Sequence, residues 1–160
     1  MIRVLGVDPG TNVLGYGVID IHKDKLTCVK YGTIVPKNNK DMVYDRLKSI
    51  APQIESIIDQ FSPSVVAIET FFVGPHSAAA LALGRMIGII YQICWKNELE
   101  VFDYEPKKVK KAVATGSSKK NVVAMMVKNI LELPMGDEIT QDATDALAVA
   151  ICHCNRLSLK

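Results

Sequence analysis

Apolar and polar positions follow first a strand-like and then a helix-like period along the chain. Three β-rich runs come first, at residues 2–8, 13–21 and 26–35, and short polar turns join them. Residues 41–61 then place apolar side chains three and four positions apart, which predicts a helix. A short apolar run at 65–69 predicts a buried strand. This order favours an antiparallel meander that leads into a helix and a fourth strand.

The second half of the chain alternates helix-like and strand-like segments. The pattern predicts a long apolar helix at 76–96, a strand at 99–102, a basic helix at 106–113 and a helix at 119–131 with Ser118 as its N-cap. A last helix begins at Asp137 or Thr140. Strands followed by alternating helices and strands predict an α/β fold, with a mixed five-stranded sheet flanked by helices on both faces.

Length and composition suit one globular domain over residues 1–160, because 49% of the side chains are hydrophobic and 22% are charged. The N-terminal apolar run is too short for a signal peptide. The longest apolar stretch, 78–95, is interrupted by Arg85 and Gln92, so no membrane span is expected. We therefore expect a cytoplasmic protein. Its cysteines lack zinc-finger spacing and are interpreted as buried hydrophobes.

Charge is unevenly distributed along the chain, although the formal total is only +2. Residues 1–100 carry ten basic and ten acidic side chains. Residues 101–131 carry seven lysines against two acids, and residues 132–160 carry two basic side chains against five acids. The chain thus sets a basic segment beside an acidic one, and the near-neutral total is no argument against a polyanionic partner.

Four carboxylates occupy positions that favour a metal site. Asp8 and Glu69 each end an apolar strand, and the carboxyl ends of such strands meet at the functional edge of an α/β sheet. Asp142 and Asp145 are three apart on a predicted helix, so they share a face and repel each other. Taken singly, each acid also fits a turn, a helix start or a solvated face. Together they predict oxygen ligands for hard cations such as Mg²⁺ or Mn²⁺.

Basic and aromatic residues supply candidate contacts to nucleic acid. Lys107 and Lys110 lie in the basic helix, and Lys119 and Lys120 lie at the next helix start, where cations are mildly unfavourable unless an anion is near. The alternative is a solvated face. Phe71 or Phe72 follows Glu69 in a loop, where an exposed aromatic ring could stack on an unpaired base; both rings could also belong to the core.

The helix predicted at 76–96 is apolar nearly all round, and such a helix is buried on both sides. Gly84 and Gly88 are four apart and form a smooth strip for close helix approach. We expect a second copy of the chain to cover this strip as a two-fold homodimer. The alternative is that the C-terminal helices of the same chain cover it.

Four blocks of sequence, in order, resemble the RuvC family of Holliday junction resolvases. They are residues 7–11 (VDPGT), 15–17 (GYG), 67–72 (AIETFF) and 142–153 (DATDALAVAICH), and the similarity extends to residues 83–84, 106–110 and 126–128. The segment 73–76 (VGPH) departs from the family, whose members more often carry polar residues there. The resemblance covers nearly the whole chain.

The resemblance implies a ribonuclease H-like nuclease domain and a homodimer. It implies an endonuclease that resolves four-way (Holliday) DNA junctions by paired, Mg²⁺-dependent phosphodiester hydrolysis in recombination and repair. The family's catalytic and metal-binding acids correspond to Asp8, Glu69, Asp142 and Asp145, which are expected to hold two Mg²⁺, with Mn²⁺ able to substitute. Its base-stacking aromatic corresponds best to Phe72, and its DNA-binding lysines to Lys110 and Lys120. A branch-migration helicase complex is a candidate partner.

Two other classes remain open from the sequence. The Asp-x-Gly-Thr motif at Asp8 also opens the phosphate loop of actin-like ATPases, although those proteins need two such lobes. The other class is a non-catalytic module that binds DNA junctions and keeps the fold without the activity, although such modules usually lose some of the four acids.

Overall fold

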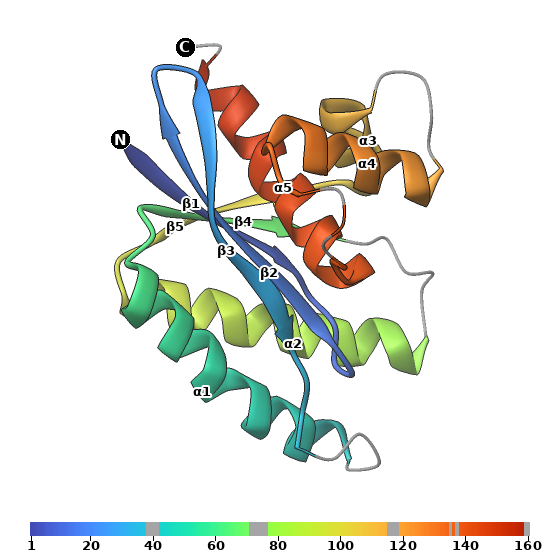
Figure 1. Cartoon of the computed structure of the whole chain (residues 1–160). Coiled ribbons are helices and arrows are strands. Elements are labelled where there is room, and N and C mark those ends of the chain that lie inside the picture. Colours follow the sequence, from blue (N-terminus) through green and yellow to red (C-terminus); the bar gives the residue numbers. More distant parts are fainter. Residues whose placement is uncertain (38–41, 71–76, 115–118, 135, 137, 159–160) are drawn as a thin grey trace.

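Backbone hydrogen bonds join five strands in the order β3-β2-β1-β4-β5 (Figure 1), which confirms the predicted mixed five-stranded sheet. The computed structural model describes residues 1–37, 42–70, 77–114, 119–134, 136 and 138–158. β1 to β3 form the antiparallel meander, and β4 and β5 add in parallel to β1 and β4. The strands are β1 (Ile2–Asp8), β2 (Leu14–His22), β3 (Lys25–Ile34), β4 (Val65–Glu69) and β5 (Glu100–Tyr104).

Helices cover both faces of this sheet, which confirms the predicted layering (Figure 1). On one face lie α1 (Val43–Phe61) and α2 (Ala78–Lys96). On the other lie α3 (Pro106–Val113), α4 (Lys120–Ile130) and α5 (Gln141–Ser158). In β1, Leu5 and Val7 pack toward α1 and α2, whereas Val4 packs toward α5. The period-two alternation of strand side chains thus builds two hydrophobic cores from one sheet.

The end of β5 differs from the sequence prediction, and the start of α5 is one of the two that were predicted. β5 continues to Tyr104, because its pairing with β4 extends through Glu69 and Tyr104. α5 begins after Thr140, whose side chain accepts a hydrogen bond from the Ala143 amide at 3.3 Å, so Thr140 and not Asp137 starts the helix. The N-cap of α4 is Lys119, and the predicted cap, Ser118, lies outside the described residues.

α2 buries only one of its sides in this chain. Ala82, Met86 and Ile90 pack on the sheet, whereas Leu81 and Trp95 are 59% and 80% exposed. The alternative, in which the chain's own C-terminal helices cover the second side, is wrong, because α3, α4 and α5 lie across the sheet (Figure 1). By length and composition alone α2 could cross a membrane, a criterion that core helices also meet.

Candidate active site

The two strand-end acids lie side by side at one edge of the sheet. β1 and β4 run parallel, and Val7 pairs with Ile68, so Asp8 and Glu69 follow at adjacent positions. Because Val7 and Ile68 pack toward α1 and α2, the alternation turns Asp8 and Glu69 to the opposite face, toward α5. The sheet therefore delivers both carboxylates to the same side.

Two glycines bring α5 onto this part of the sheet. A Cβ atom at Gly15 would overlap the backbone carbonyl of Asp142, and one at Gly6 would overlap the carbonyl of Ala146. Gly15 is also the register partner of Asp8 across β1 and β2. The missing side chains thus let the first turn of α5 sit beside the end of β1. Glycine inside a strand pattern signals such an approach, and this signal was available in the sequence.

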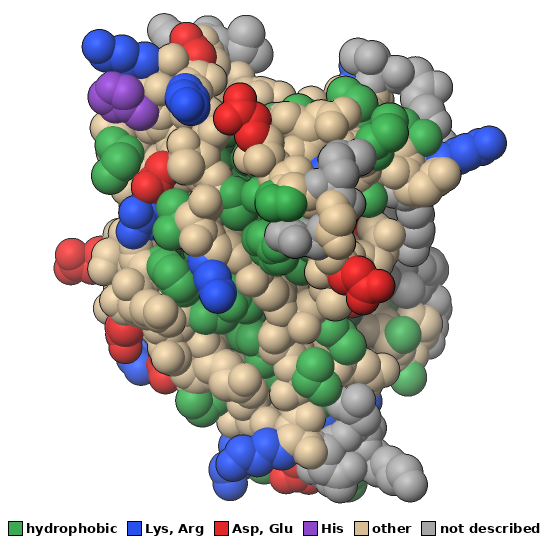
Figure 2. All heavy atoms as spheres, in the orientation of Figure 1, with side chains coloured by type: hydrophobic (Ala, Val, Ile, Leu, Met, Phe, Trp, Pro, Cys, Tyr) green, Lys and Arg blue, Asp and Glu red, His purple; other side chains and the backbone are tan. Residues whose placement is uncertain are grey.

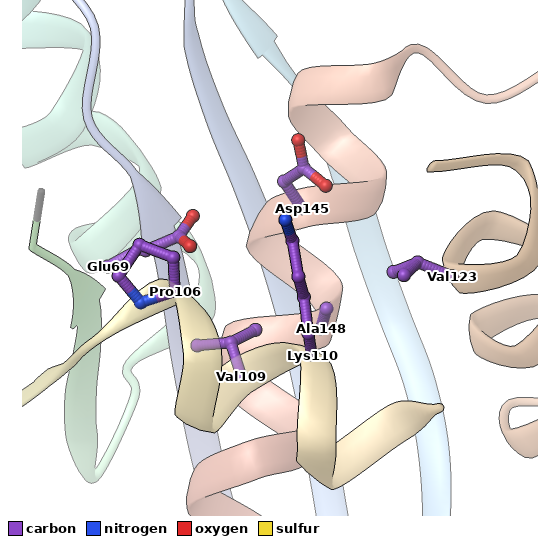
Figure 3. A pocket seen from close by; sticks show the side chains of 7 residues that line it. All are labelled: Glu69, Pro106, Val109, Lys110, Val123, Asp145 and Ala148. Carbon is purple, nitrogen blue, oxygen red and sulfur yellow. The ribbon is translucent and has the colours of Figure 1, made fainter. Parts of the chain in front are cut away.

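A pocket between the sheet edge, α3 and α5 brings Glu69 and Asp145 together with Lys110 (Figure 3). Glu69 reaches it from β4, Asp145 from α5, and Lys110 from α3 with its ammonium group directed toward Asp145. The remaining lining residues are apolar: Pro106, Val109, Val123 and Ala148. Two acids and one base therefore share a largely apolar recess.

Glu69 is a buried acid whose pKa is raised. Its side chain is 6% exposed, and burial raises its pKa to about 7. The negative charge of Asp145 adds to the increase, and the positive charge of Lys110 opposes it. Burial and the second acid both disfavour the ionised form of Glu69. A cation that enters the pocket would stabilise that form.

Asp145 is oriented by its own helix. The Gln141 side-chain amide donates a hydrogen bond of 2.8 Å to Asp145 Oδ1, from one turn earlier in α5. Gln141 carries no motif of its own in the sequence, and its i,i+4 spacing from Asp145 is the one signal that could have marked it. Asp142 lies in the same first turn, beside Gly15 and hence near Asp8.

The four acids do not form a closed metal cage in this structure. Within the described parts of the chain, no three His, Cys, Asp or Glu side chains converge closely enough to hold an ion. The pocket joins Glu69 to Asp145, the strand register sets Asp8 beside Glu69, and the helix sets Asp142 one turn before Asp145. The donor chemistry still fits a hard divalent cation, because every candidate ligand is a carboxylate.

The predicted DNA-binding residues are placed unequally. Lys110 lines the pocket, whereas Lys107 is exposed elsewhere on α3. Lys119 is exposed at the start of α4. Lys120 begins that helix, but its side chain lies outside the described residues, as do Phe71 and Phe72. On the face that Figure 2 shows, the described acidic and basic side chains are interspersed rather than gathered by sign.

His153 is a buried histidine of α5 and is 1% exposed. Its Nδ1 atom lies 2.7 Å from the Tyr104 hydroxyl oxygen in a buried hydrogen bond. The interpretation of the cysteines as structural agrees with their placement, since Cys94, Cys152 and Cys154 are buried free thiols.

The mixed sheet, its helices on both faces and the acids at its carboxyl edge define a ribonuclease H-like nuclease fold. A family model described as crossover junction endodeoxyribonuclease RuvC matches residues 4–153. The chain belongs to the RuvC family. The ATPase and non-catalytic alternatives are accordingly disfavoured, and the chain is classed with nucleases that hydrolyse phosphodiester bonds.

Individual relatives agree with this assignment. The RuvC of Caldanaerobacter subterraneus subsp. tengcongensis is 39% identical over 157 residues, covering 96% of this chain and 93% of its own length. That of Pseudothermotoga lettingae is 36% identical over 155 residues, covering 94% and 93%. The solved structure of T. thermophilus RuvC in complex with a Holliday junction substrate superposes with a TM-score of 0.86 at 26% identity, covering 99% of this chain and 96% of that one.

Proposed function

We propose that this chain resolves four-way DNA junctions by Mg²⁺-dependent hydrolysis at the pocket of Glu69, Asp145 and Lys110, with Asp8 and Asp142 completing the acidic set. The observation that carries the proposal is the meeting of a buried strand-end acid, a helix acid and a lysine in one recess of a RuvC family chain. A member of this family has been solved with a Holliday junction substrate.

The acids suit two Mg²⁺ ions, with Mn²⁺ as a substitute, because four carboxylates offer oxygen ligands on two sides of the pocket. Bound there, the ions would supply Lewis-acid activation of water and charge stabilisation for the departing 3′ oxygen. Glu69 must ionise to serve as a ligand, and its pKa of about 7 means that cation binding and proton release are coupled. The hydrogen bond from Gln141 fixes the orientation of the Asp145 carboxylate.

Lysines around the pocket support DNA binding in this proposal. Lys110 places a positive charge beside Glu69 and Asp145, where it can contact the scissile phosphate. Lys107, Lys119 and Lys120 are proposed to contact phosphates further along the strands, which makes affinity salt-dependent. Phe72 is proposed to stack on a displaced base.

A homodimer through α2 is part of the proposal. The exposed side of the helix forms a stripe at Leu81, Gly84, Arg85, Gly88, Tyr91 and Trp95. If two copies cross antiparallel at Gly88, Leu81 of each copy meets Trp95 of the other, and Arg85 meets Tyr91. The Tyr91 hydroxyl donates a hydrogen bond of 2.6 Å to Asp103, so Arg85 would also approach an acid. The stripe is thus complementary to itself, as a two-fold interface requires.

The wider setting is proposed on the same grounds. Residues 1–160 are taken as one nuclease domain that acts in the cytoplasm, with a branch-migration helicase complex as a candidate partner.

The test is a strand-cleavage assay on a synthetic four-way junction, with linear duplex of the same sequence as control. We expect paired nicks in opposed strands of the junction only when Mg²⁺ is present, with little cleavage of the duplex. Equal cleavage of junction and duplex, or cleavage that persists in EDTA, would contradict the proposal.

A further inference from the structure

A buried polar pair joins β5 to α5 at the register position next to Glu69. Tyr104 and His153 are 2% and 1% exposed, and a hydrogen bond of 2.7 Å joins the Tyr104 hydroxyl to His153 Nδ1. The Phe102 ring packs on the imidazole, with centroids 4.8 Å apart. Burying polar groups this deeply costs free energy unless they are hydrogen-bonded to each other. The bond therefore compensates for the burial of both side chains and also fixes their relative position.

Tyr104 lies beside Glu69 in the sheet. Tyr104 and Glu69 are register partners across β4 and β5, so their side chains lie next to each other on the same face. The amide of Thr70, the next residue after Glu69, donates to the Tyr104 carbonyl at 3.0 Å. Tyr104 also ends β5 two residues before Pro106 opens α3. Its position therefore fixes both the end of β4 and the start of the helix that bears Lys110.

His153 lies on the same helix as Asp145. His153 follows Asp145 by eight residues in α5, a little over two turns, which is about 12 Å of rigid helix. Any axial slide of His153 along the sheet is therefore transmitted to Asp145 and Asp142.

The other contacts of α5 differ in kind from this bond: its packing on the sheet is largely apolar, and the side-chain hydrogen bonds of Cys152 and Asn155 run to carbonyl groups of α3. Where the helix crosses β1, the backbone of Ala146 and the small side chain of Ala150 lie against Gly6. Small residues permit close approach, but apolar contact between smooth surfaces is non-directional. A hydrogen bond with a defined distance and angle supplies the register that such a surface lacks.

We propose that the Tyr104–His153 hydrogen bond is a positioning element that sets the separation of Glu69 and Asp145, and with it the readiness of the acid pocket to accept a divalent cation. The two residues act through the carboxylates and do not touch the reacting atoms. The inference rests on the carboxylate site proposed above.

The experiment compares Tyr104→Phe, which removes one hydroxyl oxygen, with His153→Leu and His153→Asn. Two quantities are measured for each: the Mg²⁺ concentration that gives half-maximal junction cleavage, and the one that gives half of the Mg²⁺-induced rise in Tm. The second needs no catalysis, because an ion that binds the folded state raises Tm by mass action. We expect Tyr104→Phe and His153→Leu to raise both concentrations by about ten-fold, a size typical of lost support behind metal ligands.

His153→Asn is the rescue variant, since its side-chain amide can place a hydrogen-bonding atom where Nδ1 lies. Its half-maximal Mg²⁺ concentrations should lie within about two-fold of the wild-type values. They should be well below those of His153→Leu, which lacks the hydrogen bond. Ile151→Val is the matched control. It removes one methylene from a buried residue of α5, lowers stability slightly, and leaves the hydrogen bond intact.

Unchanged Mg²⁺ concentrations in both Tyr104→Phe and His153→Leu would overturn the inference, whatever their Tm. An equal increase in Ile151→Val would also overturn it, because general loosening of α5 would then suffice. Failure of wild type to cut junctions defeats instead the proposed function, so the two failures are told apart by the wild-type reaction.

Discussion

Glu69 shows how one residue can be costly to the fold and useful to the site. Its pKa of about 7 lies well above the ordinary 4.5, a difference that corresponds to roughly 3 kcal/mol. Between these two values the folded chain holds a proton that the unfolded chain has lost. Stability of the metal-free protein therefore falls as pH rises from about 4.5 to about 7.

Replacing Glu69 by Gln should remove this pH dependence. We expect Glu69→Gln to melt at a higher temperature than wild type at pH 8 in EDTA and to lose junction cleavage, because the amide needs no ionisation and is a poor metal ligand. Thermal unfolding at pH 5 and pH 8 measures the difference. A wild-type Tm that stays flat or rises over this range would contradict the assigned pKa.

Lys110 and Lys107 form a matched pair on α3, one in the pocket and one outside it. Lys110→Ala removes the charge that lowers the pKa of Glu69, so cleavage should fall by about ten-fold or more at neutral pH and recover partly at higher pH. Lys107→Ala should weaken junction affinity slightly and reduce its salt dependence by about one phosphate contact, with cleavage at saturation unchanged. Equal cleavage rates for the two variants would contradict a role for Lys110 in cleavage.

At the scale of elements, the site depends on how closely α5 approaches the sheet. A methyl group at Gly15 would meet the carbonyl of Asp142, so Gly15→Ala must push the first turn of α5 away from β1. We expect a loss of roughly 1–3 kcal/mol in stability, as for other overpacked sites, and a larger loss of cleavage. Gly136→Ala is the control, because nothing lies within 4 Å of a Cβ there. A Gly15→Ala variant with normal activity would show that α5 need not approach this closely.

The sequence was informative where chemistry leaves a local pattern. Strand-end acids such as Asp8 and Glu69, and the i,i+3 pair in α5, could be picked out because periodicity shows where a strand ends and which helix positions share a face. Tyr104 and His153 could not, since they are 49 residues apart and only the packing of α5 on β5 brings them together. Nothing local distinguishes a buried histidine from a solvated one.

At the scale of the whole molecule, the exposed stripe of α2 predicts a dimer. Trp95→Glu would place a charge where two copies meet, so sedimentation velocity at micromolar concentration should show wild type as a dimer and the variant as a monomer. The monomer should still bind one junction arm but lose the paired timing of the two cuts. A monomeric wild type at that concentration would count against the α2 interface.

The four acids are expected to carry out cleavage, whereas the lysines are expected to provide junction binding. Asp8→Asn keeps the size of the side chain and leaves the lysines untouched, but it removes a carboxylate beside Glu69. Cleavage of a synthetic four-way junction in Mg²⁺ should drop below detection, while the Kd for the same junction stays within about two-fold of wild type, since phosphate contacts dominate affinity. Wild-type cleavage by Asp8→Asn would contradict the assignment of the acidic set as the catalytic centre.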